Sequence, residues 1–373
     1  MTAATRQQVG VFRIACRGPG DLSGVQALVD SAALVPGEIV AVMGKTEGNG
    51  CVNDHTRDFA AMSWSHWLAP HLECSPQEAG RRVALVMSGG TEGVLSPHFT
   101  VFTRRHVPVD AQANARRLVL GIAHTRDFLP EEIGRQAQID ATALAVREAM
   151  TDAGIASEAD VHFVQVKCPL LTAAAVEDAA GRVQTVATHD SYESMARSRG
   201  ASALGVGVAL GELAPAVAKE SAVLEDFGLS SGRASCSAGI ELQHNVVIVL
   251  GEAEGAASPF RIAHTVMKDA IDAAAVRQLL RDAFGLDPDV AGPTIRQQLV
   301  NLFAKAEASP DGRVRGGRHT MLDDSDIHST RHARAAVGAV LASVAGQTEL
   351  YVSGGAEHQG PAGGGPVAAI FRV

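Results

Sequence analysis

A short pattern that could supply a nucleophile occurs three times in the chain. An apolar run leads each time into Ser-x-Gly-x-Glu, beginning at Ser88, Ser237 and Ser353. A serine hydroxyl attacks a carbonyl carbon only when a base removes its proton. The residue after each serine is small, so that backbone N–H groups can approach a substrate oxygen as an oxyanion site requires; these residues are Gly89, Ala238 and Gly354.

Three other apolar runs end in a lysine, at Lys45, Lys167 and Lys305. The runs 39–45 and 161–167 are typical of strands, whereas 299–305 is compatible with a strand or a helix. A buried lysine beside other cations has a lowered pKa, and its neutral amine can then act as a base. Serine with lysine is a known variant of the serine-histidine-aspartate arrangement. The pattern therefore predicts nucleophilic catalysis.

An arginine introduces a helix of small residues after each lysine. The first two are Arg57 and Arg199, and the third is either Arg331 or Arg334, because the register of that segment is ambiguous. A guanidinium offers a planar fork of donors that suits a carbonyl group or an anionic ring edge. The three arginines are therefore candidates for substrate binding.

These features recur in one order and indicate internal triplication. Ile-Ala-His-Thr at 122–125 returns unchanged at 262–265, and helix-like segments follow at 23–31, 137–153 and 269–284. We predict three homologous units, whose boundaries lie in polar stretches: 1–104, 112–251 and 257–373. Strands alternate with helices in each unit, which predicts an α/β fold of α+β layers.

Three similar units in one chain tend to pack around a pseudo-threefold axis, as repeated subunits of a ring do. Their matching strand ends then meet at one centre, which predicts a single central active site. A ligand of the same symmetry is small and flat, with alternating carbonyl and N–H groups. A cyclic imide or ureide fits that description.

The composition and charge of the chain argue against nucleic acid and membranes as partners. The chain has 373 residues, of which 46% are hydrophobic and 20% charged, as in a soluble globular protein. A net charge of −9 provides no basic surface for nucleic acid or an anionic membrane. No secretory signal or membrane-spanning run is present, so we expect a cytoplasmic protein. The five cysteines never form a CxxC pair, which argues against disulfides and structural zinc.

The segment 356–366 is rich in glycine and contains one glutamate. Converging carbonyl groups and a carboxylate would suit a hard cation such as Mg²⁺ or Ca²⁺. Taken alone, these residues favour a plain flexible loop over a cation site.

The motifs together resemble those of the cyanuric acid hydrolase and barbiturase family. The segments are GKTEGNG (44–50), MSGGTEG (87–93) and VSGGAEHQGP (352–361), with KCPLL (167–171) and MLDDSD (321–326). The resemblance extends over essentially the whole chain. It implies three repeat units around a pseudo-threefold axis and the hydrolytic opening of a cyclic amide without a catalytic metal. Cyanuric acid would give carboxybiuret, which loses CO₂ to form biuret.

The resemblance also implies roles for individual residues. The family's middle pair corresponds to Ser237 as nucleophile and Lys167 as its base. The outer pairs, Ser88 with Lys45 and Ser353 with Lys305, would bind and polarise the other two carbonyl groups. The substrate would be clamped by Arg57, Arg199 and Arg334, with Arg331 in reserve.

The resemblance also implies a homotetramer. It further implies a structural Mg²⁺ or Ca²⁺, so the segment 356–366 is now expected to be a cation site and not a plain flexible loop. The cation ligands would be Glu307, Ala356, Gln359, Gly360, Pro361 and Gly364. Two alternatives remain at this point. A barbiturase would open barbituric acid to ureidomalonate, although that ring replaces one N–H by CH₂ and breaks the threefold symmetry. A non-catalytic module would bind planar ureides without turnover.

Overall fold

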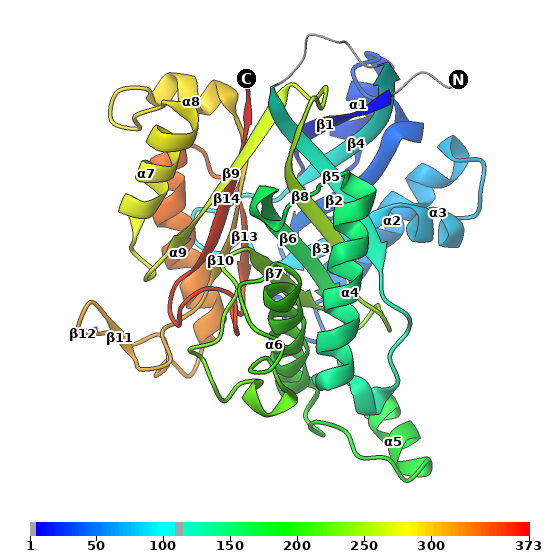
Figure 1. Ribbon diagram of the computed structural model, residues 1–373, viewed down its shortest axis with the longest axis vertical. Helices are drawn as coiled ribbons and strands as arrows, with labels where there is room; N and C mark the ends of the chain where they lie inside the picture. Colours follow the sequence, from blue (N-terminus) through cyan, green and yellow to red (C-terminus); the bar gives the residue numbers. More distant parts are fainter. Residues whose placement is uncertain (1–4, 109–114) are drawn as a thin grey trace.

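The computed structural model describes residues 5–108 and 115–373. Twelve of its strands form three four-stranded sheets (Figure 1). In sheet order, the first contains β1 (Thr5–Ala15), β4 (His98–Pro108), β2 (Ile39–Thr46) and β3 (Ala84–Gly89). The second contains β5 (Arg116–His124), β8 (Val246–Glu254), β6 (Val161–Cys168) and β7 (Ala234–Ala238). The third contains β9 (Phe260–Met267), β14 (Gly365–Arg372), β10 (Leu299–Ala306) and β13 (Tyr351–Gly354).

The three sheets share one strand order. In each, the first strand pairs with the last, the last with the second, and the second with the third, and only that final pair is parallel. The second strand of each sheet also carries a register shift at its start, between residues 39 and 41, 161 and 163, and 299 and 301. The predicted α/β fold is confirmed, and the segment 299–305, left open by its sequence, is a strand.

The predicted unit limits at 104 and 251 lie inside β4 and β8, whose pairing continues to Pro108 and Glu254. The predicted limit at 112 lies outside the described residues.

Nine α-helices occur in the described ranges. They are α1 (Ser23–Asp30), α2 (His55–His71), α3 (Pro76–Arg82), α4 (Gln136–Ala153), α5 (Ala173–Gly181), α6 (Ser191–Ala209), α7 (Ala273–Phe284), α8 (Gly292–Gln298) and α9 (Ser329–Ala345). Four single 3₁₀ turns (Pro36–Glu38, Pro130–Glu132, Glu158–Asp160 and Glu220–Ala222) and the small hairpin of β11 (Arg313–Val314) and β12 (Gly317–Arg318) complete the fold. No helix in these ranges is long and apolar enough to cross a membrane.

Two of the helices that lead into the candidate site begin after a capping aspartate. The Asp54 carboxylate accepts a hydrogen bond from the backbone of Thr56, and the Asp190 carboxylate accepts one from Glu193, so α2 and α6 begin directly after these aspartates. The sequence placed Arg57 and Arg199 before their helices, and this was wrong. Both arginines lie within helices because the caps stand upstream of them.

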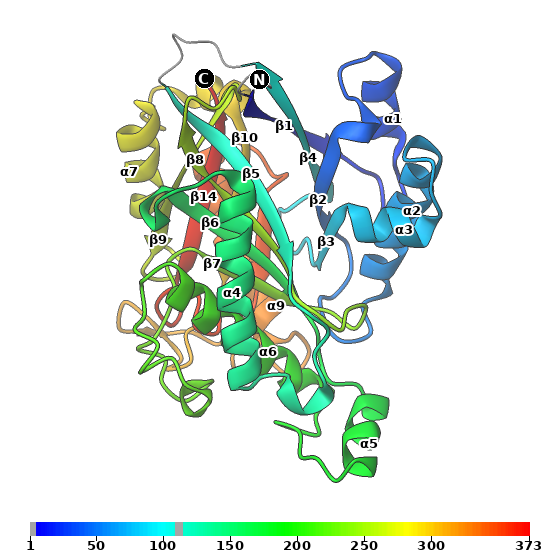
Figure 2. The same cartoon turned by 45° about the vertical axis from the view of Figure 1, so that its right-hand side comes forward.

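The sheets surround a shared apolar core and the helices cover their outer faces (Figures 1 and 2). Phe102, Phe163 and Phe303, one from each sheet, meet with ring centroids 5.5–6.3 Å from Phe303. On the outside of the first sheet, Trp64 of α2 packs edge-on against Phe99 of β4. Each such buried ring stabilises the fold by about 1.5–3 kcal/mol, so the core fixes the mutual placement of the sheets.

Candidate active site

The parallel strand pair of each sheet places a lysine opposite a serine. The register pairs Lys45 with Ser88, Lys167 with Ser237 and Lys305 with Ser353. All six residues lie at or near the carboxyl ends of their strands, and the three lysine side chains are at most 1% exposed. Three separate sequence patterns therefore share one structural arrangement.

One small pocket collects the serines and the arginines. Its lining includes all nine of the predicted substrate-binding residues other than the lysines: Arg57, Ser88, Gly89, Arg199, Ser237, Ala238, Arg334, Ser353 and Gly354. Gly50, Met87 and Met195 also line it and were not predicted. Gly50 and Met87 belong to motifs already singled out, whereas Met195 lies one turn before Arg199 on α6 and carries no sequence signal of its own.

In the first and third sheets, the lysine contacts the serine directly. Lys45 Nζ lies 3.1 Å from Ser88 Oγ, and Lys305 Nζ lies 3.2 Å from Ser353 Oγ. Lys305 Nζ also donates to the carbonyl of Cys236 at 2.8 Å. Each of these hydroxyls is therefore held by a buried amine.

The middle sheet differs. Lys167 Nζ lies 2.9 Å from Glu241 Oε1 and donates to the carbonyl of Met87 at 2.9 Å. Ser237 Oγ instead lies 3.0 Å from Ser353 Oγ. Lys167 and Ser237 are thus neighbours in strand register, but their side chains do not hydrogen-bond to each other in this structure.

Burial lowers the pKa of all three lysines. The pKa of Lys305 falls to about 7, first because of burial and then because of the nearby Arg199. Burial and Arg334 hold the pKa of Lys45 well below its ordinary value. Burial also lowers the pKa of Lys167, while the Glu241 carboxylate acts in the opposite direction. Amines of this kind become proton acceptors at a lower pH than an exposed lysine does.

Two arginines are oriented by the glutamate that ends a serine motif. Arg334 Nε donates to Glu92 at 2.7 Å, and Nη2 contacts the other oxygen of the same carboxylate. Arg199 donates to Glu357 at 2.8 and 2.6 Å. Such two-point pairs fix the plane of the guanidinium. It is Arg334, and not Arg331, that reaches the pocket.

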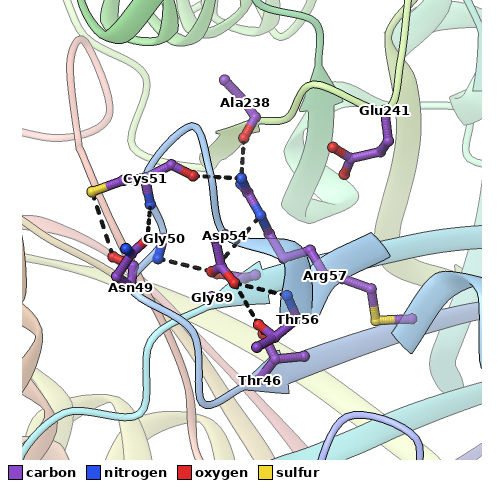
Figure 3. A network of polar contacts seen from close by, with 12 residues as sticks. Thr46, Asn49, Gly50, Cys51, Asp54, Thr56, Arg57, Gly89, Ala238 and Glu241 are labelled. Carbon is purple, nitrogen blue, oxygen red and sulfur yellow. Dashed lines mark hydrogen bonds and ion pairs between the residues drawn. The ribbon is translucent and has the colours of Figure 1, made fainter. Parts of the chain in front are cut away.

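The third arginine is held differently (Figure 3). Arg57 donates to the carbonyls of Ala238 at 2.9 Å and Cys51 at 2.7 Å, and its Nε lies 3.9 Å from Asp54. Figure 3 shows Glu241 beside Arg57. Within the described part of the chain, however, the ion-pair partner of Glu241 is Lys167. The middle sheet is therefore the point at which the repeated pattern of contacts breaks.

Hydrogen bonds join the last loop to neighbouring segments. Gly360 N donates to Ser231 O, and Ser231 N donates to His358 O, both at 2.9 Å. The side chain of Gln359 is buried and accepts a hydrogen bond from the backbone of Cys236 at 2.6 Å. This loop packs beside Glu307, which accepts a hydrogen bond from Gly363 N at 3.4 Å.

Glu307 has a partly buried carboxylate without a cationic partner among the described residues, which suits a site for a hard cation. Burial and the neighbouring Glu357 raise the pKa of Glu307 to about 7, and no ion pair to Glu307 is found among the described residues. No group of three or more His, Cys, Asp or Glu side chains that could hold a metal occurs in residues 5–108 and 115–373. The predicted ligand set contains a single carboxylate, so it depends on loop oxygens, which Mg²⁺ and Ca²⁺ accept.

Comparison with known proteins places this geometry in context. Residues 10–372 match the model of a family described as amidohydrolase ring-opening protein (Amido_AtzD_TrzD). A cyanuric acid amidohydrolase of Bradyrhizobium diazoefficiens is 60% identical over 367 residues, 98% of this chain and 98% of that protein. One of Pseudomonas sp. strain ADP is 60% identical over 366 residues, 98% of this chain and 99% of that protein. A solved structure described as "Cyanuric acid hydrolase: evolutionary innovation by structural concatenation" superposes with a TM-score of 0.94 at 58% identity, covering 99% of this chain and 100% of that one.

Proposed function

Because the chain belongs to the amidohydrolase ring-opening protein family, we propose that it is an enzyme that hydrolyses cyanuric acid at a ring C–N bond. The full-length 60% identity to two cyanuric acid amidohydrolases carries this proposal. The pocket supports it, because each of the three sheets brings one serine to the same small space.

The pocket suits the symmetry of the ring. Cyanuric acid has three carbonyl groups that alternate with three N–H groups. Three serine hydroxyls and three guanidinium groups offer it a matching set of polar contacts. The outer lysines, each within hydrogen-bond distance of its serine, would help Ser88 and Ser353 to bind and polarise two of the carbonyls.

Ser237 acts as the nucleophile on the third carbonyl in this proposal. Its proton passes to the neutral amine of Lys167 while Oγ attacks the carbonyl carbon, and backbone N–H groups around the serines stabilise the oxyanion. The C–N bond then breaks, and Lys167 gives the proton to the departing ring nitrogen. A water molecule, activated by the same amine, releases carboxybiuret, which loses CO₂ to form biuret.

The choice of the middle pair follows the family resemblance and is supported by the environment of the pair, because the strand register is the same for all three pairs. Lys167 lies opposite Ser237 across β6 and β7. Among the three lysines, all of which lie in described residues, Lys167 is the one in an ion pair. The partner in this ion pair is the Glu241 carboxylate. It can exchange a proton with Lys167, which suits the pair that carries out the proton transfers in this proposal.

A structural Mg²⁺ or Ca²⁺ belongs to the same proposal. Glu307 would hold it together with oxygen atoms of Ala356, Gln359, Gly360, Pro361 and Gly364, and the bound cation would neutralise the buried carboxylate. Its role would be to fix the loop that contains Glu357, the partner of Arg199. A homotetramer and a cytoplasmic location complete the proposal, as the resemblance and the composition predict.

Turnover of cyanuric acid beside barbituric acid on purified protein tests the proposal. Loss of each ring's ultraviolet absorbance is followed in the presence of Mg²⁺, and biuret is identified as the product. We expect loss of cyanuric acid. Loss of barbituric acid alone would identify a barbiturase instead, and loss of neither would support a ureide-binding module.

A further inference from the structure

Glu241 departs from the pattern set by its two counterparts. Each serine motif ends in a glutamate, and Glu92 and Glu357 both pair with an arginine of the pocket. Glu241 pairs with Lys167 at 2.9 Å instead. A carboxylate beside an arginine can only orient it, because arginine does not give up its proton. A carboxylate beside a lysine of lowered pKa can exchange a proton with it.

Glu241 also connects a buried amine to solvent. The side chain of Lys167 is 1% exposed, whereas that of Glu241 is 24% exposed. Glu241 does not line the serine pocket but a separate groove of about 740 Å³ between the first two units. The carboxylate therefore has Lys167 on one side and a wide groove on the other.

The groove contains groups that accept and donate protons. His244 Nδ1 lies 3.0 Å from Asp127 Oδ1, and His244 Nε2 lies 3.3 Å from His124 Nδ1. Arg81 and Arg126 also face the groove. On the opposite side, Glu241 is near Arg57 and Asp58 of α2 as well as Lys167. Arg126 is already paired with Glu132, so Lys167 and Arg57 are the cations that favour an ionised Glu241 at rest.

We propose that Glu241 is the proton-exchange partner of Lys167, and that the groove behind it is where this proton equilibrates with solvent. The inference rests on the proposed function, and it adds a positioning residue to the Ser237 and Lys167 pair. Burial raises the pKa of Glu241, but Lys167 and Arg57 lower it below its ordinary value, in keeping with an ionised carboxylate.

The proton movements balance. Glu241 first takes one proton from the Lys167 ammonium, which leaves a neutral amine and a neutral carboxyl group. The amine takes the proton of Ser237 as the Oγ–C bond forms, and gives it to the ring nitrogen as the C–N bond breaks. It then takes a proton from water as the water oxygen bonds to the acyl carbon, and returns it to Ser237 as the ester bond breaks. Glu241 finally returns its proton to Lys167, or exchanges it with water in the groove.

The test is Glu241→Gln, which keeps the shape and a hydrogen-bond acceptor but cannot take a proton. We expect kcat to fall about 100-fold, the scale of general acid–base catalysis. The acid limb of the kcat profile should move, because protonation of Glu241 no longer contributes to it and only the titration of Lys167 remains. The matched variant Glu92→Gln should raise KM and keep that limb, because Glu92 only orients Arg334.

Chemical rescue provides a second readout. In Glu241→Ala, the groove leaves room for formate, which should restore kcat in a saturable manner, whereas Glu92→Ala should show no such rescue. A Gln variant with wild-type kcat and an unchanged acid limb would overturn the inference, as would a folded Ala variant that formate does not rescue. If the Ala variant fails to fold, the Gln profile decides. A wild-type protein that opens no ring would overturn the proposed function itself, and this inference with it.

Discussion

The hydroxyl groups of Ser237 and Ser353 lie 3.0 Å apart, although they belong to different sheets and are separated by 116 positions in the chain. Ser353 also contacts Lys305 Nζ at 3.2 Å. The proposed nucleophile and the proposed binding hydroxyl therefore face the same small space, and a ligand that contacts one serine is within reach of the other.

Removing each serine should separate chemistry from binding. We expect Ser237→Ala to lower kcat by about 10⁴ to 10⁶, because in the proposed mechanism no other group forms the acyl intermediate. Ser88→Ala and Ser353→Ala should mainly raise KM, by about 10-fold, the value of one hydrogen bond. Steady-state kinetics with cyanuric acid measures both. A larger loss of kcat in Ser88→Ala than in Ser237→Ala would move the nucleophile to the first sheet.

The two candidate arginines of the third unit should behave differently. Arg334→Met removes a buried guanidinium and leaves Glu92 without its partner, so KM should rise about 10- to 100-fold, as expected for a charged hydrogen bond. The nearby Arg331→Met, which changes no pocket residue, should alter KM less than threefold. Equal effects of the two substitutions would contradict the assignment of Arg334 to the pocket.

Lys305 should make stability depend on pH. Its pKa is about 7 in the folded protein and about 10.5 when unfolded, so the unfolded chain binds the extra proton between these values. The free energy of unfolding should therefore rise between pH 7 and pH 10.5, by at most about 1.4 kcal/mol per pH unit. Lys305→Met should flatten the rise, as measured by denaturant unfolding from pH 7 to pH 10. The contribution of Lys45, which has the same sign, should remain.

Cation binding should depend on the ionisation of Glu307. Because the pKa of Glu307 is about 7 without a cation, protons compete with the metal below that pH. Mg²⁺ or Ca²⁺ should raise the unfolding temperature more at pH 8 than at pH 6, and chelation should reverse the effect. At a cation concentration 100 times Kd, the bound cation raises the free energy of unfolding by about 2.7 kcal/mol. Glu307→Gln should remove this gain, and an unchanged gain in that variant would place the cation elsewhere.

The contact of β5 with α4 should not tolerate a side chain at Gly121. A Cβ atom there would lie 1.9 Å from the carbonyl oxygen of Ala149 and 2.6 Å from the nitrogen of Ala153, so the helix would have to move. We expect Gly121→Ala to destabilise the protein by about 1–3 kcal/mol. Gly181→Ala, where a Cβ meets nothing within 4 Å, should be neutral or slightly stabilising. Thermal unfolding of both variants checks the contrast.

The sequence by itself determined the α/β fold and the family, and it predicted the three repeats, with which the common strand order of the three sheets agrees. It could do so because the serine and lysine motifs are local, and because apolar runs and helical spacing of apolar residues can be recognised in short stretches of sequence. It placed Lys45, Lys167 and Lys305 at the ends of apolar runs, and the structure has all three on strands. The local signal was weaker for the helix starts, where Arg57 and Arg199 stand downstream of the capping aspartates.

Only the tertiary structure decided which residues meet across units. The family resemblance already favoured Arg334 over Arg331, but only the structure shows that Arg334 reaches Glu92 from 242 positions away. The contact of Lys167 with Glu241, in place of a glutamate–arginine pair, depends on how the sheets pack around their common core. The repeated motifs predict the same glutamate–arginine contact three times. Two of these contacts form, and the third is replaced by the contact of Glu241 with Lys167 because the three units are not identical and pack differently. This contact lies beside Ser237.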